Sequence, residues 1–173
     1  MGRSPSSGAG DNRALSEELV NLFREAMSSL ASGVAVITAR RDDGHPCGLA
    51  ATSVSSYSAD PPSLLVAVAH SSRCHPALVA STHFGLHLLR ADEEPIARVF
   101  AGQGDDKFAG VTWRWDDEVP ELDGTIAYLR CRHSAIFERY DHSILIGDLE
   151  GGRIGEGEPL LYARRRMDWR LES

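Results

Sequence analysis

Lysine is nearly absent from this chain of 173 residues, since Lys107 is the only one among 18 basic residues. Acidic residues outnumber basic ones and give a formal charge of -7. A nucleic acid is a polyanion and needs a clustered basic face, so this charge argues against a nucleic-acid partner. A small anionic ligand needs only a few local donors, and the charge leaves that class of ligand open.

Cysteine is also scarce. Cys47, Cys74 and Cys131 are widely spaced and form no Cys-x-x-Cys pair, which suits free thiols in a reducing compartment better than a disulfide framework. No run is long and apolar enough to span a bilayer, and the N-terminal residues lack the hydrophobic stretch of a signal peptide. We therefore expect a soluble cytoplasmic protein with no membrane partner. Residues 1–14, rich in Ser, Gly and Pro, are predicted to be a disordered tail, and residues 15–173 a single domain.

Several site motifs are missing. No Gly-x-Gly-x-x-Gly follows a strand and there is no Walker loop, which disfavours a Rossmann or P-loop site. The absence of a Gly-x-Ser-x-Gly elbow disfavours a serine hydrolase, whereas Cys–His chemistry stays open because such partners need be close only in space. His83 and His87 are four residues apart, a spacing that binds metal on a helix, but they lie in a strand-like alternation. We expect no metal site.

Hydrophobic periodicity predicts the elements that are present. Ser16 is expected to cap a helix that Gly33 ends, and its apolar stripe is expected to face the core; the stripe comprises Leu19, Leu22, Phe23, Ala26, Met27 and Leu30. Further helices are predicted at residues 77–81 and 92–101. Strands are predicted at residues 34–38, 63–69 and 83–89, and at residues 125–140 and 142–152, which meet at Asp141 as a hairpin. Strands this close in sequence favour a mainly β protein, an antiparallel sheet or β-barrel with peripheral helices, over a doubly wound fold.

The segment "GLAATSVSSYSADPP", residues 48–62, is unusual for the interior of a domain because it is almost all small residues and hydroxyls. It is predicted to include a strand. Small side chains on a strand let a planar ligand approach the backbone, whose N–H and C=O groups and neighbouring hydroxyls can then bind its edge. A tight contact between two strands, or between two copies of the chain, would favour the same residues. Composition alone leaves both interpretations open.

A second candidate site is the loop Ser71-Ser72-Arg73, which follows a predicted strand and precedes a short predicted helix. Two hydroxyls, a fixed cation and a nearby helix N-terminus suit a phosphate group. The alternative is an ordinary loop whose serines cap the helix. The sequence leaves both interpretations of this loop open.

The order of these segments resembles the flavin reductase family, the small NAD(P)H-dependent partners of two-component flavin monooxygenases, built on the FMN-binding split barrel, a Greek-key-like antiparallel barrel. The matching pieces cover nearly all of residues 23–162 in the family order: "FREAMSSLASGVAVITA", "GLAATSVSSYSADPP" leading into "SLLVAVA", "DDKFAG", "LDGTIAYLRC", "DHSILIGDL" and "PLLY".

The resemblance implies a flavin site. The residues expected to line the isoalloxazine ring are Ala50, Ala51, Thr52, Ser53, Val54, Ser55 and Ser56. Ser71, Ser72 and Arg73 are expected near the ribityl phosphate, with Lys107 and Phe108 in a loop on the same side. His142 matches a histidine that faces the flavin–nicotinamide region and is the candidate catalytic residue.

The activity implied by the resemblance is hydride transfer from NADH or NADPH to FMN or FAD, with reduced flavin passing to a separate monooxygenase, and the expected assembly is a homodimer. Tyr140 and Met167 depart from the family pattern, which commonly has Gly and Tyr there. They motivate an alternative, a flavin-binding protein of this fold without reductase activity, such as an FMN-dependent oxidase, a carrier or a sensor. A third possibility is a flavin-free dimeric scaffold in which the small residues only pack.

Overall fold

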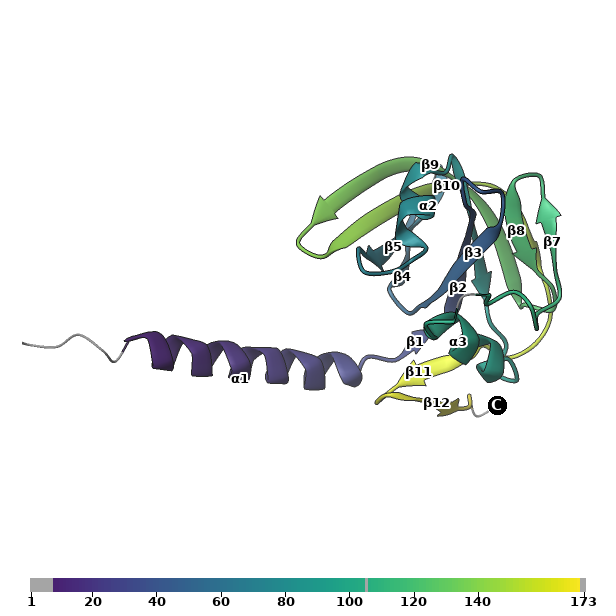
Figure 1. Ribbon diagram of the computed structural model, residues 1–173. Coiled ribbons are helices and arrows are strands. Elements are labelled where there is room, and N and C mark those ends of the chain that lie inside the picture. The colour runs from purple at the N-terminus through teal and green to yellow at the C-terminus, as the bar shows by residue number, and fades with distance from the viewer. Residues whose placement is uncertain (1–7, 105, 172–173) are drawn as a thin grey trace, which may run out of the picture.

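A computed structural model describes residues 8–104 and 106–171 of the chain (Figure 1). Its centre is a seven-stranded sheet in which every neighbouring pair is antiparallel, in the order β3-β2-β6-β9-β10-β5-β4. The strands are β2 (Ala35–Arg40), β3 (Pro46–Ala51), β4 (Val54–Ala59), β5 (Pro62–Ala69), β6 (His83–Leu88), β9 (Ala127–Arg139) and β10 (His142–Ile154). The mainly β, antiparallel architecture expected from the sequence is confirmed.

The two edge strands of this sheet, β3 and β4, are consecutive in the chain, and only Thr52 and Ser53 separate them. In a flat sheet of seven strands the two edges would be about 29 Å apart. Three peptide links span at most about 11 Å. The sheet therefore has to curl until its edges meet at Thr52–Ser53, where the Ser53 hydroxyl donates a hydrogen bond to the Ala67 carbonyl of β5 at 2.8 Å. We call this meeting point, Thr52 and Ser53, the seam.

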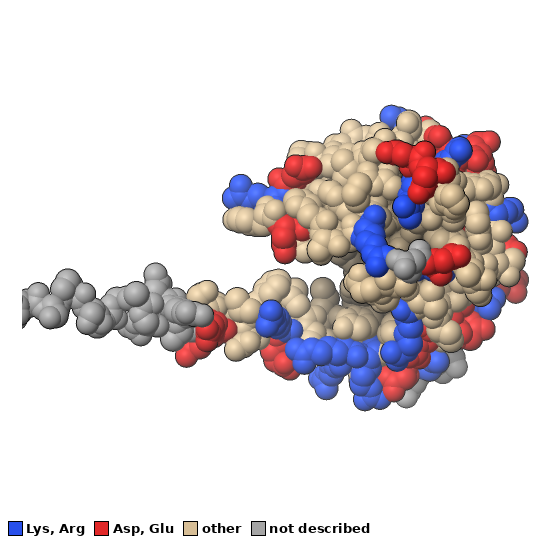
Figure 2. All heavy atoms as spheres, in the orientation of Figure 1, with Lys and Arg blue, Asp and Glu red and all other residues tan. Residues whose placement is uncertain are grey.

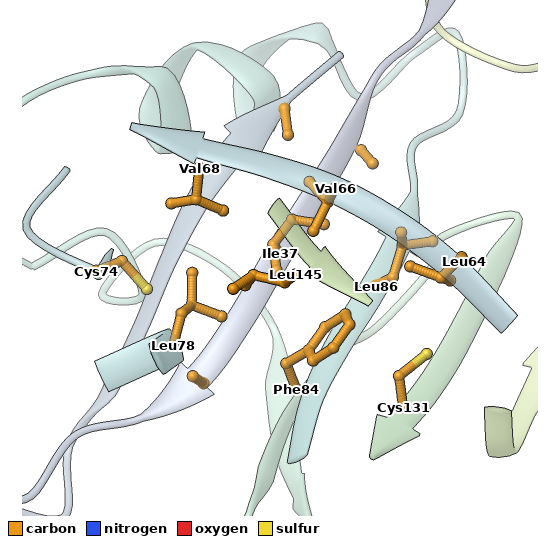
Figure 3. Packing of buried hydrophobic residues seen from close by; sticks show 13 residues of the cluster. Ile37, Leu64, Val66, Val68, Cys74, Leu78, Phe84, Leu86, Cys131 and Leu145 are labelled. Carbon is orange, nitrogen blue, oxygen red and sulfur yellow. The ribbon is translucent and has the colours of Figure 1, made fainter. Parts of the chain in front are cut away.

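The inside of the curled sheet is the main hydrophobic core. Alternate residues of β5 point inward, namely Leu64, Val66 and Val68, as the strand period of two requires. They meet Ile37 of β2, Phe84 and Leu86 of β6, Leu145 of β10 and Leu78 of the short helix α2 (His75–Ala80), as Figure 3 shows. Packing this set fixes the curvature of the strands that carry the seam.

A second cluster covers the outer face of β2, which is why β2 is buried on both faces. Phe100 of α3 (Glu94–Ala101) packs there edge-on to Phe108, with ring centroids 5.1 Å apart. The approach of α3 to β3 requires a glycine at position 48, because a Cβ atom there would lie 2.6 Å from Cε1 of Phe100. The end of α3 is thus held directly against β3.

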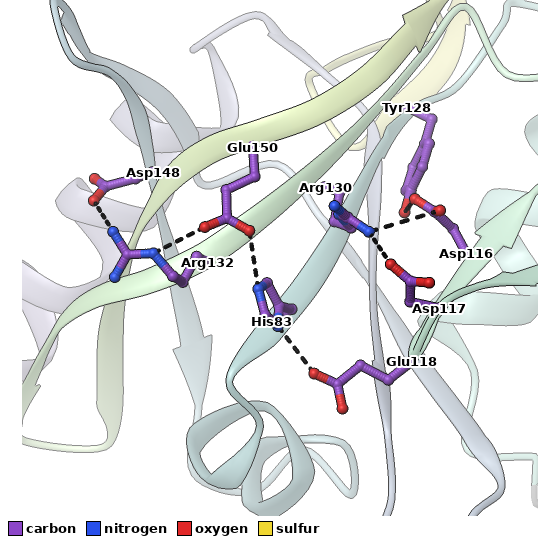
Figure 4. Close-up of polar contacts among 9 residues, drawn as sticks. All are labelled: His83, Asp116, Asp117, Glu118, Tyr128, Arg130, Arg132, Asp148 and Glu150. Carbon is purple, nitrogen blue, oxygen red and sulfur yellow. Dashed lines mark hydrogen bonds and ion pairs between the residues drawn. The ribbon is translucent and has the colours of Figure 1, made fainter.

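The remaining strands form two small sheets. β7 (Trp113–Asp116) pairs with β8 (Val119–Leu122), and β11 (Leu161–Ala163) lies between β1 (Ser32–Gly33) and β12 (Arg166–Trp169). The β7–β8 turn is tied to the large sheet by polar contacts (Figure 4): the Tyr128 hydroxyl binds Asp116 at 2.9 Å, and His83 lies between Glu118 and Glu150 at 2.9 and 3.0 Å. The exposed contacts of His83 contribute little energy singly, but together with the part-buried Tyr128 contact they fix the orientation of the turn.

The first helix differs from its prediction. α1 (Gly8–Ser28) begins eight residues before Ser16 and ends before Gly33, and residues 1–7 of the predicted tail lie outside the described residues. The stripe expected to face the core is exposed; for example, Leu22 and Phe23 are 67% and 64% accessible. Figure 1 shows α1 projecting away from the sheets. The core-facing prediction was wrong because periodicity identifies an apolar face without identifying what covers it.

Other predictions correspond to the structure with small shifts. The hairpin is confirmed, since β9 and β10 pair with only Tyr140 and Asp141 between them. α2 and α3 lie at or near the predicted helices. The segment of small residues is two strands, β3 and β4, that pair with different neighbours. Among the described residues, no helix combines the length and apolar character needed to cross a membrane.

His87 of β6 is a fully buried imidazole held in its neutral form. Its Nε2 accepts the Leu122 N–H at 3.1 Å, so Nδ1 carries the proton and donates to the Val36 carbonyl at 3.2 Å. Burial lowers the pKa of His87 from 6.5 to about 3. The unfolded chain therefore takes up a proton that the folded chain does not, and stability contributed by neutral His87 is present above pH 6.5 and falls as the pH drops toward 3.

We predict that lowering the pH from 7 to 5 removes about 2 kcal/mol of unfolding free energy through His87 alone. Urea unfolding at the two pH values measures this loss. His87→Gln should show a smaller pH dependence than the wild type, whatever its absolute stability. His45→Gln, a change at an exposed histidine, is the control and should keep the wild-type dependence. Equal pH dependence in the wild type and His87→Gln would contradict the assignment.

Candidate active site

A cavity of about 430 Å³ opens at the seam, within the size range of small-molecule sites. One wall is the end of β3 with Thr52 and Ser53, and the opposite wall is the end of β5 with the loop that follows it. The C-terminal end of α3 and the loop 102–104 close a third side. The cavity exists because the two edges of the sheet meet here without pairing along their length.

Small side chains make up the walls on both strands: Ala50 and Ala51 come from β3, and Ala67 and Ala69 from β5. Thr52 and Ser53 are exposed and add hydroxyls beside the backbone of the seam. A planar group can therefore approach the main chain closely, and the peptide and hydroxyl groups can bind its polar edge.

Two cations lie at one end of the cavity, Arg73 in the loop before α2 and Lys107 in the loop after α3. The Lys107 ammonium donates to the Phe100 carbonyl at 2.8 Å and to the Gly48 carbonyl at 3.4 Å. Burial lowers the pKa of Lys107. These bonds tie the loop to both α3 and β3, so Lys107 positions the wall of the site as well as charging it.

The loop Ser71-Ser72-Arg73 lines the same cavity, and Ser72 also contacts the residues that begin α2. The Ser72 hydroxyl accepts the Cys74 N–H at 3.3 Å, and the Ser72 carbonyl accepts the His75 N–H at 3.0 Å. Cys74 is the N-cap residue of α2, which has no side-chain capping hydrogen bond, so the serines do not cap the helix as the alternative expected. Arg73 extends the cationic end that begins at Lys107.

His142 reaches the rim of the cavity from the first residue of β10, where it is paired with Ala69. Its Nδ1 is 2.9 Å from a carboxylate oxygen of Asp141, and this hydrogen bond lowers the pKa of the Asp141 carboxyl. The contact fixes the ring and turns Nε2 away from Asp141. The imidazole is half-exposed and accessible to a ligand that covers the cavity.

The structure brings together Ala50, Ala51, Thr52, Ser53, Ser71, Ser72, Arg73, Lys107 and His142 in one cavity. Val54, Ser55 and Ser56 continue along β4 and do not line it. Phe108 lines a neighbouring cavity, and its ring is buried between Phe100 and Trp113. Its main contribution is to packing.

The chain matches the model of the flavin reductase like domain over residues 27–169. It belongs to this family. The segment order that suggested the family is therefore confirmed, and the curled antiparallel sheet is the fold that its structural relatives share.

Three relatives illustrate the range of the family. FMN reductase (NADH) SmoA of Agrobacterium fabrum is 37% identical over 142 residues, 82% of this chain and 80% of that protein. The reductase component of 4-nitrophenol 4-monooxygenase/4-nitrocatechol 2-monooxygenase from Rhodococcus opacus is 35% identical over 84% of this chain and 78% of its own. The NADH:FAD oxidoreductase SgcE6 of Streptomyces globisporus, solved in complex with NAD and FAD fragments, superposes with a TM-score of 0.78 at 29% identity, covering 83% and 88% of the two chains.

The residues that line the cavity at the seam have the chemistry that a flavin needs. The small-residue walls suit the flat ring, the hydroxyls and backbone groups suit its heteroatom edge, and Arg73 with Lys107 suits a phosphate. Among the described residues that line the cavity, His142 is the only ionisable side chain other than these cations. Within residues 8–104 and 106–171, no group of three or more His, Cys, Asp or Glu side chains is placed to hold a metal ion.

The sequence reasoning missed the wall formed by the end of α3 and the following loop, with Phe100, Ala101, Gly102, Gln103 and Gly104. The available signal was the glycine-bearing run "GQG" after a predicted helix, which marks a loop but not its neighbours. The packing of Phe100 against Gly48 and the hydrogen bonds from Lys107 place this loop over β3.

We predict that Ala50→Leu weakens FMN binding at least about tenfold, a change of about 1.4 kcal/mol, because the added side chain occupies the space against the β3 wall. Quenching of FMN fluorescence on titration measures the dissociation constant. Ala59→Leu is the same change at an exposed position at the far end of β4, outside the cavity, and should leave the constant unchanged. Unaltered binding by a folded Ala50→Leu protein would place the flavin elsewhere.

Proposed function

We propose that this protein is an NADH-dependent flavin reductase that supplies reduced flavin to a separate monooxygenase. The observation that carries the proposal is the cavity at the seam, where the small-residue walls, the hydroxyls, two cations and His142 come together. Relatives named as an NADH-dependent FMN reductase and as the reductase component of a monooxygenase support the activity and the kind of partner.

When bound, a flavin would supply the redox chemistry, as the acceptor of a hydride from the nicotinamide. The chain's own part is orientation and charge. The backbone and hydroxyls of Ala50–Ser53 hold the ring edge, while Arg73 and Lys107 hold the phosphate. His142, oriented by Asp141, would lie beside the bound flavin at the rim of the cavity, within reach of a nicotinamide that stacks there.

The flavin can be FMN or FAD. A second cavity of about 550 Å³ adjoins the first and shares Arg73, Gly104 and Lys107 with it. The adjoining space lies beyond the proposed phosphate position, so it can receive the larger nucleotide of FAD. FMN needs the first cavity alone.

The departures from the family pattern do not fall in the site. Tyr140 is at the tip of the β9–β10 hairpin, 86% exposed with φ of 55°, and Met167 of β12 packs against the outer hydrophobic cluster. Neither lines the cavity at the seam. Tyr140 and Met167 therefore give no support to the alternative, a flavin-binding protein without reductase activity.

We predict that the purified protein oxidises NADH faster with FMN than an enzyme-free blank does, and that Arg73→Gln raises the KM for FMN about ten- to a hundredfold, the effect of losing one charged hydrogen bond to phosphate. The KM for riboflavin, which has no phosphate, should change little. The fall in NADH absorbance measures the rate of NADH oxidation with FMN and with riboflavin, and the KM for each flavin follows from these rates.

Arg98→Gln removes an exposed arginine of α3 outside both cavities and is the control for the change of charge. Absence of flavin-dependent NADH oxidation by the wild-type protein would overturn the proposed function. An equal rise in KM for FMN and riboflavin with Arg73→Gln would overturn the phosphate role alone.

We further propose that the protein is a homodimer held by the apolar face of α1. Leu19, Leu22 and Phe23 are each more than 60% exposed, and Figure 2 shows an open gap between α1 and the rest of the molecule. Burying each such side chain is worth about 1.5–3 kcal/mol. A second copy offers a matching apolar surface, namely its own α1 and the exposed Phe137 of its hairpin.

The free thiols of Cys47, Cys74 and Cys131 support a cytoplasmic location.

We predict that Leu22→Glu shifts the protein from dimer to monomer at micromolar concentration, because it places a charge in the buried face of the proposed interface. Sedimentation velocity measures the mass. Asn21→Glu adds the same charge on the neighbouring polar side of α1 and should remain dimeric. A monomeric wild-type protein, or a Leu22→Glu dimer of wild-type strength, would contradict this interface.

A further inference from the structure

Two cysteines line one cavity beside the flavin cavity. Cys47 belongs to β3, and Cys74 directly precedes α2. Both line the adjoining cavity of about 550 Å³, and each thiol shifts the pKa of the other. Cys74 is buried in the main core, and Cys47 is half-buried and packs against it. The two residues are far apart in the chain but adjacent in the fold.

The surroundings distinguish the two thiols. The hydrogen bond from Cys74 lowers the pKa of Cys47, with further help from the Ala39 backbone and the charges of Arg41 and Lys107. The same hydrogen bond and burial raise the pKa of Cys74. Cys47 is therefore the thiol that ionises first, while Cys74 keeps its proton and acts as the hydrogen-bond donor. The third thiol, Cys131, is fully buried, and burial raises its pKa to about 12.

We propose that Cys47 and Cys74 form an intrachain disulfide when hydrogen peroxide enters the cavity. The Cys47 thiolate attacks one peroxide oxygen, the O–O bond breaks, and hydroxide leaves, so that sulfur is oxidised to the sulfenic acid as peroxide is reduced. The Cys74 sulfur then attacks the Cys47 sulfur, the S–S bond forms, and the sulfenic oxygen leaves as water with the thiol proton. A dithiol reverses the reaction.

The place of the pair in the fold gives the modification its significance. β3 carries Ala50 and Ala51, and the loop before Cys74 carries Ser72 and Arg73, so the disulfide would crosslink two walls of the flavin site. The oxidant arises where reduced flavin meets oxygen, because that reaction yields hydrogen peroxide. This source rests on the proposed function, whereas formation of the disulfide does not.

The test treats the full-length protein, without flavin or NADH, with hydrogen peroxide. Free thiols are then alkylated in denaturant, and the disulfide-linked peptides are mapped by mass spectrometry. We expect the loss of two of the three thiols, one crosslinked peptide pair containing Cys47 and Cys74, and full recovery with dithiothreitol. Cys131→Ser should give the same crosslink. Cys74→Ser should instead stop at the sulfenic acid of Cys47, which dimedone labels.

Three results would overturn the proposal. They are a sulfenic or sulfinic acid at Cys47 of the wild type without a crosslink, a disulfide that involves Cys131 or joins two chains, and three intact thiols after treatment. The wild-type map decides the matter even where a serine variant folds poorly. Since the assay uses no flavin turnover, its failure is distinct from a failure of the proposed reductase activity.

Discussion

Thr52 and Ser53 have to join the two edges of a seven-stranded sheet, and this short link forces the sheet to curl. The curl encloses the main core and leaves an unpaired seam where β3 ends and β4 begins. A seam of this kind exposes backbone groups on a rigid support, a combination that folded proteins otherwise avoid at sheet edges. The cavity of the candidate site is the space that results.

The remaining walls of the cavity come from elements that pack beside the seam. Gly48 lets Phe100 approach β3, and Lys107 joins the Phe100 and Gly48 carbonyls, so the end of α3 becomes a third wall. Across the cavity, the turn after β5 carries Ser72 and Arg73, and the following Cys74 lines the adjoining cavity together with Cys47 of β3. The elements that form the candidate site therefore also place two cysteines on one cavity.

Most of the site could be predicted from the sequence because its residues lie in short segments of unusual composition. Ala50 to Ser53 and Ser71 to Arg73 attracted attention for their small side chains and hydroxyls, and both line the cavity. Val54 to Ser56 were included in the prediction but do not line the cavity, because composition does not change where the chain passes from one sheet edge to the other. Which strand pairs with which is decided by contacts between distant segments, and those leave no local signal.

The fold could be predicted in class and hairpin, whereas α1 could not be placed. Its period of 3.6 defines an apolar face, but the partner of that face is a matter of tertiary or quaternary packing. The wall at residues 100–104 was missed for a related reason, since glycines mark a loop without saying what it covers.

A crystal structure of the protein with FMN tests the central claim most directly. The account predicts the isoalloxazine ring against the backbone of Ala50 to Ser53, with the phosphate at Arg73 and Lys107 and with His142 at the open face. FMN bound away from the seam, or bound there with its phosphate pointing away from the two cations, would contradict it.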